Sequence, residues 1–385
     1  MTSTCDVVIV GGGVLGLWAA KFAADAGLDV MLIDKNDCGS GGSNGVLGAL
    51  LPHLPNASNE KKRFQLEALV ELQELVAALE EQTGEEVGYK RVGRLMPIRL
   101  EGFKKRVVRC VQEAPKNWQL GEQVFNFEHR EVDPAGNWIN TDLAPLGVAF
   151  DNLSARAAPR RLTKALKASL TERVKIIEDF EFGSFDENSG QVFSLDGKRT
   201  ISTKNLVLAA GYQTYDLLKP ITHCELGHGV KGHSALFRLP GVSDQPILYD
   251  NGVYVVPHED GTVAVGSTAE NEWSGEHEVV EANCTPFIER AKELCPPLQG
   301  AELVSLWAGI RPRSFAKDPI IGRLAEDSGI FILTGGFKIS FGIAHRLARA
   351  VVERLMGYEN PVELPQSYEV AYHLAEAKSD NREIK

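Results

Sequence analysis

The 385-residue sequence contains no uninterrupted apolar run that approaches the ~20 residues of a membrane-spanning helix. It therefore predicts no integral membrane segment. The first predicted strand begins within six residues of Met1, which leaves no room for the charged and apolar regions of a secretory signal. We expect a cytoplasmic protein.

The sequence also has no excess of positive charge and no closely spaced cysteines. Its 41 basic and 52 acidic residues give a net charge of −11, which argues against a nucleic-acid partner held mainly through phosphate contacts. The six cysteines are scattered without any C-x-x-C pair, so they predict reduced, mostly buried thiols and no metal cluster. An anionic substrate would have to meet local cations in a generally acidic chain.

The composition that remains is that of a globular protein, with 43% hydrophobic and 24% charged residues. The length favours two domains. Residues 221–268 predict short antiparallel strands, whereas the segments on either side predict buried parallel strands and helices. Such a change of pattern indicates two domains that interleave along the chain.

The strongest motif occupies the first thirty-five residues. A buried β-branched strand at 6–10 leads directly into G-x-G-x-x-G, and a helix at 17–26 and a second buried strand at 29–33 follow. Gly11 permits the tight turn, Gly13 allows close approach of a diphosphate, and Gly16 lets the helix pack on the strand. Because these parts come in the order that a dinucleotide site requires, they predict one.

Further segments support this site. Asp34 ends the second strand and is placed to accept hydrogen bonds from ribose hydroxyls. The glycine-rich loop at 39–45 contains small residues that would let backbone amides reach a cofactor, and residues 205–211 predict another buried strand that ends in glycine. We also predict a long amphipathic helix at 60–83, and a single strand at 174–185.

The chain resembles the D-amino-acid oxidase family of FAD-dependent oxidoreductases, which includes the glycine and sarcosine oxidases. The resemblance spans nearly the whole chain. Beyond the first motif, its most specific parts are Trp307-Ala308-Gly309-Ile310-Arg311-Pro312, Asp318-Pro319-Ile320-Ile321-Gly322 and the segment Thr334 to Gly342. The last two would not be expected in a nicotinamide dehydrogenase.

The resemblance implies an α/β fold, with a Rossmann-like FAD/NAD(P)-binding domain and an interleaved, mostly antiparallel α+β substrate domain. It places the adenosine of FAD at 11–35 and the flavin ring near the C-terminal segments. The residues that it assigns to FAD are Gly11, Gly13, Val14, Leu15, Gly16, Asp34, Lys35, Ser43, Asn44, Gly45, Val174, Ala210, Gly211, Gly309, Gly336, Phe337, Lys338 and Ile339. We expect residues 1–85, 146–220 and 305–385 in the FAD-binding domain, and 86–145 and 221–304 in the substrate domain.

Three residues are candidates for the chemistry. The resemblance implies that Arg311 binds the substrate carboxylate, a role that suits the bidentate geometry of a guanidinium. Lys338, with the following helix N-terminus near Gly342, would supply positive potential for the negative charge of the reduced flavin. Tyr254 would line the pocket, although packing within the sheet explains this residue equally well.

The chain departs from the sarcosine oxidases at two points. Those enzymes have a lysine, associated with oxygen activation, where this chain has Ala264, so the electron acceptor is open between O2 and another carrier. They also attach FAD through a cysteine near the Arg311 segment, and no cysteine lies between Cys295 and Lys385. We therefore expect non-covalent FAD.

The leading interpretation is oxidation of the C–N bond of a small amino acid or secondary amine by hydride transfer to flavin N5, giving an imine that hydrolyses. A neutral amine needs no strong base, so His228, His233 and His258 are expected to be structural or at the surface. The alternatives are a 2-hydroxy-acid or glycerol-phosphate type FAD dehydrogenase, a tRNA-modifying FAD enzyme and a non-catalytic FAD-binding subunit. We expect a small-molecule substrate with a carboxylate, no nucleic acid, and a homo-oligomer as an option that the sequence leaves open.

Overall fold

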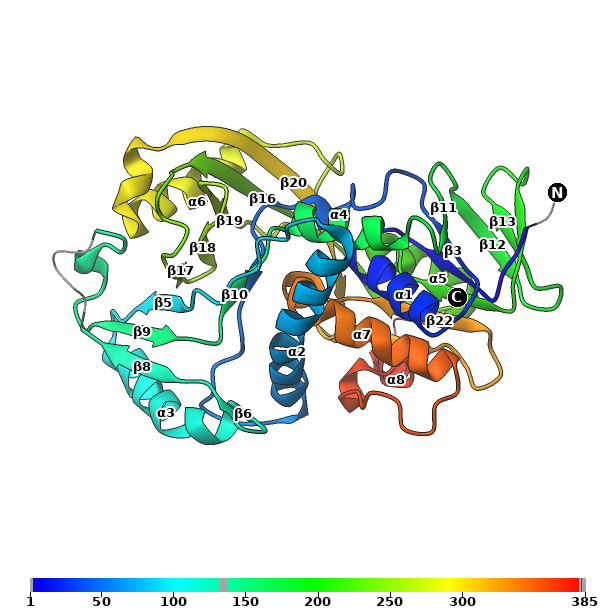
Figure 1. The fold of residues 1–385 in the computed structure, drawn as a ribbon, viewed down its shortest axis with the longest axis horizontal. Helices are drawn as coiled ribbons and strands as arrows, with labels where there is room; N and C mark the ends of the chain where they lie inside the picture. Colours follow the sequence, from blue (N-terminus) through cyan, green and yellow to red (C-terminus); the bar gives the residue numbers. More distant parts are fainter. Residues whose placement is uncertain (1–2, 132–136, 381, 383–385) are drawn as a thin grey trace.

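A six-stranded sheet forms the centre of one half of the molecule, on the right in Figure 1. The computed structural model describes residues 3–131, 137–380 and 382. In spatial order the strands of this sheet are β11 (Lys175–Ile177), β3 (Val30–Ile33), β2 (Val7–Val10), β15 (Asn205–Leu208), β22 (Ile330–Thr334) and β21 (Ile320–Arg323). All neighbours pair in parallel except β21, which is antiparallel to β22. The buried strands predicted from β-branched runs are thus confirmed.

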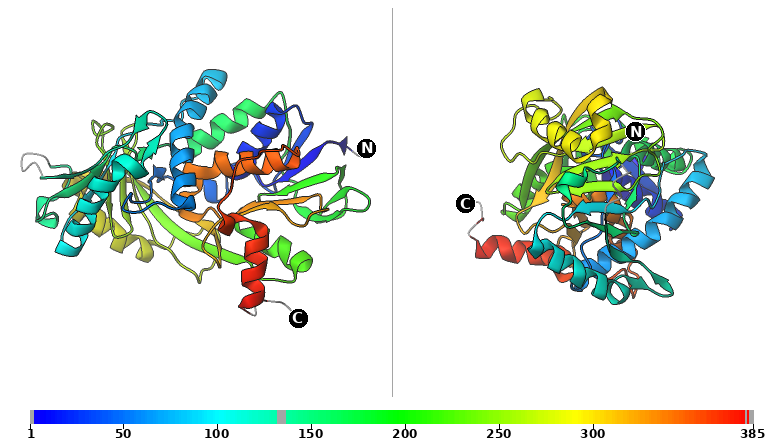
Figure 2. Two further views of the ribbon diagram at one scale, coloured as in Figure 1. Left: turned by 90° about the horizontal axis from the view of Figure 1, so that it is seen from below. Right: turned by 90° about the vertical axis from the view of Figure 1, so that its left-hand side faces the viewer.

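The two faces of this sheet are covered differently. Val7 and Ile9 of β2 point toward a core that includes helices α1 (Val14–Asp25), α2 (Glu60–Thr83), α4 (Pro159–Leu170) and α7 (Ser340–Leu355). Val8 and Val10 point the other way, toward α5 (Thr214–Thr222), α8 (Val370–Ser379) and a small four-stranded sheet. In Figure 2 helix α8 projects from the edge of this half. Burial on both faces explains why the strands lack polar alternation.

The four-stranded sheet corrects one prediction. It consists of β1 (Ser3–Thr4), β14 (Thr200–Ser202), β13 (Gln191–Ser194) and β12 (Phe182–Asp186). The single strand predicted at 174–185 is wrong, because this segment is divided between β11 of the first sheet and β12 of the second. The chain turns between them at Asp179, which has a φ of 63°. Both halves are rich in strand-forming residues, so the sequence pattern does not reveal the turn.

An eight-stranded sheet forms the other half. In spatial order its strands are β20 (Glu302–Ser314), β16 (Gly227–Arg238), β19 (Thr262–Gly266), β18 (Val253–Pro257), β17 (Ile247–Asp250), β5 (Arg94–Pro97), β9 (Val148–Asp151) and β8 (Phe127–Arg130). All pairs are antiparallel except β17 with β5. Helix α6 (Glu281–Leu294) packs against one face. The two sheets confirm the predicted α/β class with a mostly antiparallel second part.

The domain ranges remain a prediction. The pairing of the strands does not follow the boundaries of those ranges at every point. Strands β9 and β20 fall within or largely within ranges assigned to the FAD-binding domain, yet both are hydrogen-bonded into the eight-stranded sheet. Strand β20 is 13 residues long and pairs with β16 along almost its whole length. The remaining elements are α3 (Glu101–Asn117), the pair β4 (Ala49–Leu50) with β10 (Ala155–Arg156), and the pair β6 (Gln119–Leu120) with β7 (Gln123–Val124).

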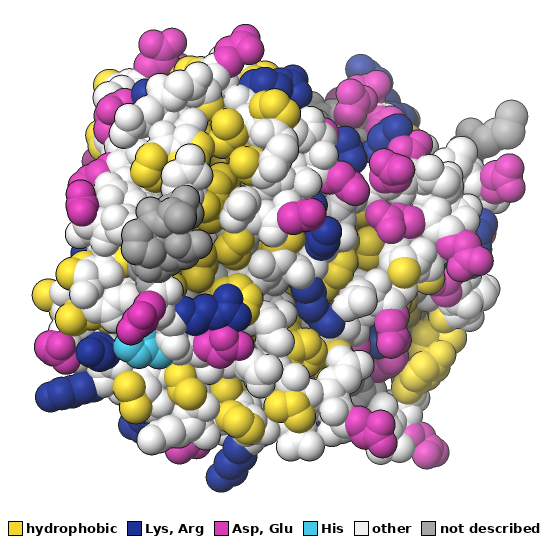
Figure 3. All heavy atoms as spheres, turned by 60° about the vertical axis from the view of Figure 1, so that its left-hand side comes forward, with side chains coloured by type: hydrophobic (Ala, Val, Ile, Leu, Met, Phe, Trp, Pro, Cys, Tyr) yellow, Lys and Arg dark blue, Asp and Glu magenta, His cyan; other side chains and the backbone are white. Residues whose placement is uncertain are grey.

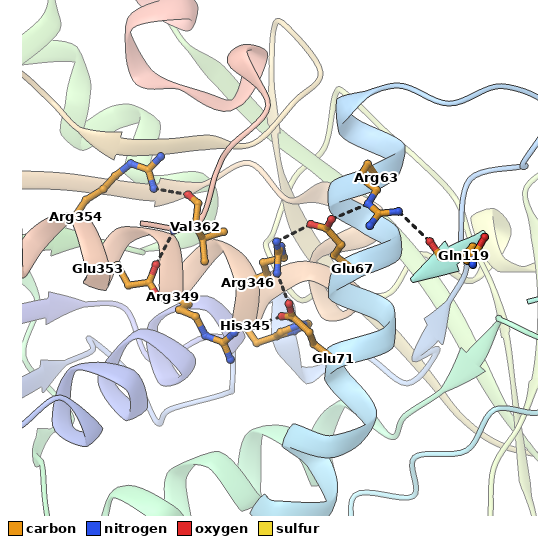
Figure 4. Close-up of polar contacts among 10 residues, drawn as sticks. All are labelled: Arg63, Glu67, Glu71, Gln119, His345, Arg346, Arg349, Glu353, Arg354 and Val362. Atoms are coloured by element: carbon orange, nitrogen blue, oxygen red, sulfur yellow. Dashed lines mark hydrogen bonds and ion pairs between the residues drawn. The ribbon is translucent and has the colours of Figure 1, made fainter. Parts of the chain in front are cut away.

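The predicted helix at 60–83 is confirmed as α2, and it lies between the two halves (Figure 1). Its apolar stripe is buried, while Glu67 and Glu71 on a more accessible side face α7. Arg346 of α7 binds both carboxylates, and its Nη2 lies 2.6 Å from Glu67 Oε2 (Figure 4). Hydrophobic packing and ion pairs therefore both hold α2 against α7.

On the face drawn in Figure 3, acidic and basic side chains are interspersed with hydrophobic ones. None of the helices within the described ranges is long and apolar enough to cross a membrane. In the same ranges, no group of three or more His, Cys, Asp or Glu residues is arranged to hold a metal ion.

Candidate functional site

A cavity of about 420 Å³ joins the glycine-rich loop of the first motif to the eight-stranded sheet. At one end it is lined by Gly11, Asp34 and Lys35, and elsewhere by Tyr254, Arg311 and Lys338. The size is within the usual range for small-molecule sites, ~300–1,000 Å³. The structure thus brings the predicted nucleotide-binding and chemical residues to one cavity.

The turn at Gly11 to Gly13 allows close approach of a ligand. Gly11 has a φ of 104°, a conformation that other residues rarely adopt, and a methyl group there would overlap the carbonyl of Ala209. Helix α1 begins just after Gly13 without a side-chain cap. The N–H groups of the first turn and the helix dipole favour a bound diphosphate.

Asp34 and Ser43 hold this loop in place. Asp34 Oδ2 accepts a hydrogen bond from the backbone N–H of Gly12 at 2.6 Å, and Oδ1 accepts one from Asn36 at 2.9 Å. Burial raises the pKa of Asp34, while these two hydrogen bonds favour its ionised form. Ser43 Oγ accepts from the backbone N–H of Val14 at 2.9 Å. The role of Asp34 toward a ribose stays a prediction, and the structure adds a bracing role.

Arg311 enters the cavity from β20. Its Nη1 donates to the carbonyl of Thr268 at 3.0 Å, and this is the one hydrogen bond of its guanidinium within the described residues. Burial lowers the pKa of Arg311 to about 10, and the nearby Tyr254 and Glu270 oppose that change. The guanidinium therefore remains positive at neutral pH with donors available to a ligand.

Lys338 enters from a different element, the 3₁₀ turn Phe337–Ile339. It is exposed toward the cavity, and its Nζ lies 5.9 Å from the centre of the Phe337 ring. Burial, followed by the positive charges of Arg311 and Arg313, lowers the pKa of Lys338 to about 8. The guanidinium of Arg313 also lies near Phe337, 5.2 Å from the ring centre. Arg311, Arg313 and Lys338 thus form a cluster of three cations near Phe337.

Tyr254 lines the cavity from β18 and also packs within the sheet. Its ring centre lies 4.9 Å from that of Tyr249, and burial raises its pKa to about 12. The phenol therefore stays protonated at neutral pH and is a hydrogen-bond donor, not a base. Tyr254 thus both lines the cavity and packs within the sheet, the two positions considered from the sequence.

The structure does not bring every predicted cofactor residue to the cavity surface. Besides the residues described above, Val14, Leu15, Gly45, Ala210, Gly211 and Phe337 line it. Asn44 lines an adjacent hollow. The predicted residues outside the cavity lining are Gly16, Val174, Gly309, Gly336 and Ile339.

Gly16 and Gly309 nevertheless shape the walls of the site. A methyl group on Gly16 would overlap the carbonyl of Gly11, and one on Gly309 would overlap the ring of Trp307, which lines the cavity. Val174 is buried in the core where the chain leaves α4, and its N–H donates to the carbonyl of Leu170. The cavity is reached instead by Phe180, Glu181 and Phe182, beyond the turn that the sequence did not reveal.

The three histidines considered from the sequence make structural contacts and do not line the cavity. His233 is fully buried and its Nδ1 lies 2.8 Å from Glu270, while the backbone N–H of Val280 donates to its Nε2. His258 is buried with its Nε2 bonded to the carbonyl of Val46, and the ring of His228 lies against Phe315. His277 does line the cavity.

Other residues of the site carry no recognisable sequence signal. The hydroxyl of Tyr212 donates a hydrogen bond to Glu276 at 2.5 Å, and both residues line the cavity. Ser234 and Ser267 line it from the eight-stranded sheet and the loop after β19. Ala264, where the sarcosine oxidases have lysine, is fully buried in an apolar cluster with Val46.

These observations define a class of protein: a fold with a candidate dinucleotide site at the carboxyl ends of parallel strands, continuous with a cavity against an antiparallel sheet. The start of helix α1, the turn at Gly11 and the continuous cavity fit FAD. Residues 6–350 match the family described as FAD dependent oxidoreductase. The chain belongs to that family.

Characterised relatives align over almost the entire chain. The glycine oxidase of Bacillus licheniformis is 23% identical over 369 residues, which cover 94% of this chain and 95% of that protein. The glycine oxidase of Pseudomonas putida is 27% identical over 374 residues, covering 94% and 97% respectively. These are similarities, and the substrate named for each belongs to that protein.

Solved structures show the same fold. The glycine oxidase of Geobacillus kaustophilus superposes with a TM-score of 0.84 at 22% identity, covering 96% of this chain and 99% of that one. The iminodiacetate oxidase of Chelativorans sp. BNC1 gives a TM-score of 0.81 at 22% identity, with 94% and 98% covered. The predicted Rossmann-like FAD-binding fold is therefore confirmed.

Proposed function

We infer that this enzyme oxidises the C–N bond of a small amino acid or secondary amine that carries a carboxylate. The observation that carries this inference is Arg311, a positive side chain in a mostly apolar cavity that continues to the glycine loop. The glycine oxidases among its relatives support the same reaction class. FAD, when bound, supplies the acceptor for the hydride that leaves the substrate α-carbon.

The residues of the chain bind and orient the substrate. Arg311 keeps one donor on Thr268 and offers the others to a carboxylate, whose two oxygens match a guanidinium bidentately. Tyr254, whose pKa is about 12, can donate a further hydrogen bond to the same carboxylate. Holding the carboxylate fixes the direction of the α-hydrogen, which is the main contribution that positioning makes to the rate.

The reaction class does not require a strong base. The hydrogen leaves the carbon as a hydride, so no side chain must remove a proton from carbon. The amine reacts in its neutral form, so it needs no strong base either. A hydroxy acid would need a group to take the hydroxyl proton; His228, His233 and His258 lie outside the cavity lining, whereas His277 lines it. The glycine oxidases among the relatives, and not the lack of a base, favour amine oxidation over a hydroxy-acid dehydrogenase.

The electron acceptor is proposed to be O2 or another carrier, and the cytoplasmic location and homo-oligomeric state stay predictions from the sequence. The function is tested by mixing the holoenzyme with glycine, sarcosine, iminodiacetate, alanine enantiomers, lactate and glycerol 3-phosphate without oxygen. Loss of the flavin absorbance with amines alone supports the proposal. Bleaching by lactate or glycerol 3-phosphate, without bleaching by any amine, would contradict it.

A further inference from the structure

The cations at one end of the cavity lack acidic partners. Arg311 and Lys338 line the cavity and Arg313 lies beside Phe337, yet none of the three forms an ion pair within the described residues. The buried Arg94, by contrast, is paired, and its Nε lies 2.8 Å from Asp151. The chain has 52 acidic residues, so the missing partners do not reflect a shortage of carboxylates.

Such a cluster suits a ligand with more than one negative charge. Like charges that are close together in a partly buried site repel each other, and this repulsion adds to the effect of burial in lowering the pKa of Lys338. One carboxylate on Arg311 would neutralise one of these three charges and leave two. A second carboxylate would neutralise another and leave one.

We propose that the substrate is an amine with two carboxylates, that Arg311 binds the carboxylate beside the oxidised carbon, and that Lys338 binds the second carboxylate. The substrate class is then an N-carboxymethyl amine or a dicarboxylic amino acid. This proposal rests on the proposed function for its amine, but the binding of a dianion can be tested without any reaction.

The positions of the two cations favour separate carboxylates. Arg311 comes from β20 and Lys338 from the turn at 337–339, so they enter the cavity from different elements. The fork of Arg311 matches one carboxylate in two bonds, whereas the flexible lysine acts as a point charge with a wide reach. Ile310 and Phe337 also line the cavity and offer apolar contact to the carbon chain of the ligand.

The reaction balances for such a substrate. A hydride leaves the C–H beside the carboxylate on Arg311 and its two electrons reduce FAD, while the nitrogen loses a proton and a C=N bond forms. Water then adds to the carbon, the C–N bond breaks, and a 2-oxo acid and an amine are released. With an N-carboxymethyl substrate, the amine product keeps the carboxylate that Lys338 held.

The test compares two ethers that cannot react as amines. Oxydiacetate has two carboxylates and methoxyacetate has one, and isothermal titration calorimetry measures the Kd of each for the holoenzyme. We expect oxydiacetate to bind the wild type at least tenfold more tightly. In Lys338→Met this ratio should fall to within threefold, and in Lys338→Arg it should persist. Lys105→Met, which removes an exposed lysine on α3 outside the cavity lining, should keep the wild-type ratio.

Two results would overturn the proposal. Equal affinity of the wild type for both ethers would show that no second carboxylate is bound. A Lys338→Met enzyme that loses affinity for both ethers by the same factor would show that both cations hold a single carboxylate. Failure of all amines to bleach the flavin would instead contradict the reaction class, because binding of the ethers does not depend on it.

Discussion

The guanidinium of Arg311 lies in the space where Gly232 has no side chain. A methyl group on Gly232 would overlap both Nη nitrogens of Arg311. Gly232 in β16 is paired in register with Gly309 in β20, and Arg311 is two residues beyond Gly309 on the same face. The lack of a side chain at Gly232 therefore determines the position of the Arg311 guanidinium, to which we assign the substrate carboxylate.

Gly232→Ala should displace Arg311 and lower kcat/KM for a carboxylate substrate by roughly tenfold to a hundredfold, because small misplacements of positioning groups are costly. The fold should survive, since the overlap is with the end of a flexible side chain and not with backbone. FAD content and Tm are measured beside the kinetics. Gly102→Ala, whose methyl group would meet no atom within 4 Å, is the control. An unchanged kcat/KM in Gly232→Ala would mean that Arg311 works equally well elsewhere.

Arg311→Ala should lower kcat/KM by roughly thirtyfold to several thousandfold, the equivalent of about 2–5 kcal/mol for a lost partner of a buried carboxylate. Arg311→Lys keeps the charge but loses the fork, so it should be impaired less. Both variants should retain FAD, because Gly11 and Asp34 lie at the other end of the cavity. A value for Arg311→Ala within threefold of wild type would show that another group, with Lys338 the next candidate, holds the carboxylate.

FAD should be released when the protein is precipitated with acid, leaving a yellow supernatant. No cysteine among the described residues lines the cavity. Cys295 is fully buried and burial raises its pKa to about 12, which keeps the thiol in its unreactive protonated form. Absorbance of the pellet and the supernatant measures the outcome. Flavin that remains in the washed pellet would indicate a covalent bond.

The parts of the site that could be predicted are those set by neighbouring residues in the sequence. The turn at Gly11, the start of α1 and the position of Asp34 all follow from one continuous strand–turn–helix–strand unit. The family resemblance then added Arg311 and Lys338, both of which line the cavity. Their roles remain predictions that the variants above test.

The parts that could not be predicted depend on pairing between distant segments. Contact between Gly232 and Arg311 follows from the register of β16 with β20, and no local pattern encodes a register. Phe180 to Phe182 reach the cavity only because the chain turns after β11. Glu276 accepts a hydrogen bond from Tyr212, which is 64 residues away in the sequence, and it does so from a loop without any motif. Tertiary structure, not local propensity, positions these residues.

Arg346→Met should lower the free energy of unfolding by about 1–3 kcal/mol, between the typical effects for exposed and buried ion pairs. The side chain of Arg346 is 14% exposed and binds Glu67 and Glu71 of α2, so its loss leaves two neighbouring carboxylates without their shared partner (Figure 4). Urea denaturation of the holoenzyme measures the change. Arg173→Met breaks an exposed pair with Asp25 and should cost less than about 1 kcal/mol. Equal effects would refute a special role for the α2–α7 contact.

The affinity for oxydiacetate should fall by about fivefold to tenfold between pH 7 and pH 9, because Lys338 has a pKa of about 8. Below this pKa the ammonium group holds the second carboxylate, and above it the charge is lost. Arg311, with a pKa of about 10, stays mostly positive over this range, and Tyr254, with a pKa of about 12, stays neutral. The positive charge of Arg313 also lowers the pKa of Lys338, and Arg313 is unchanged in every variant.

Calorimetric titrations at several pH values measure this dependence, with methoxyacetate as the reference ligand. Its affinity should change much less, because Arg311 alone holds it and both ligands are fully ionised throughout. Lys338→Arg should flatten the profile for oxydiacetate, since a guanidinium keeps its proton to higher pH than an ammonium group. A flat wild-type profile would show that Lys338 does not hold the second carboxylate. A pH dependence that Lys338→Met reproduces would show that another group titrates in this range.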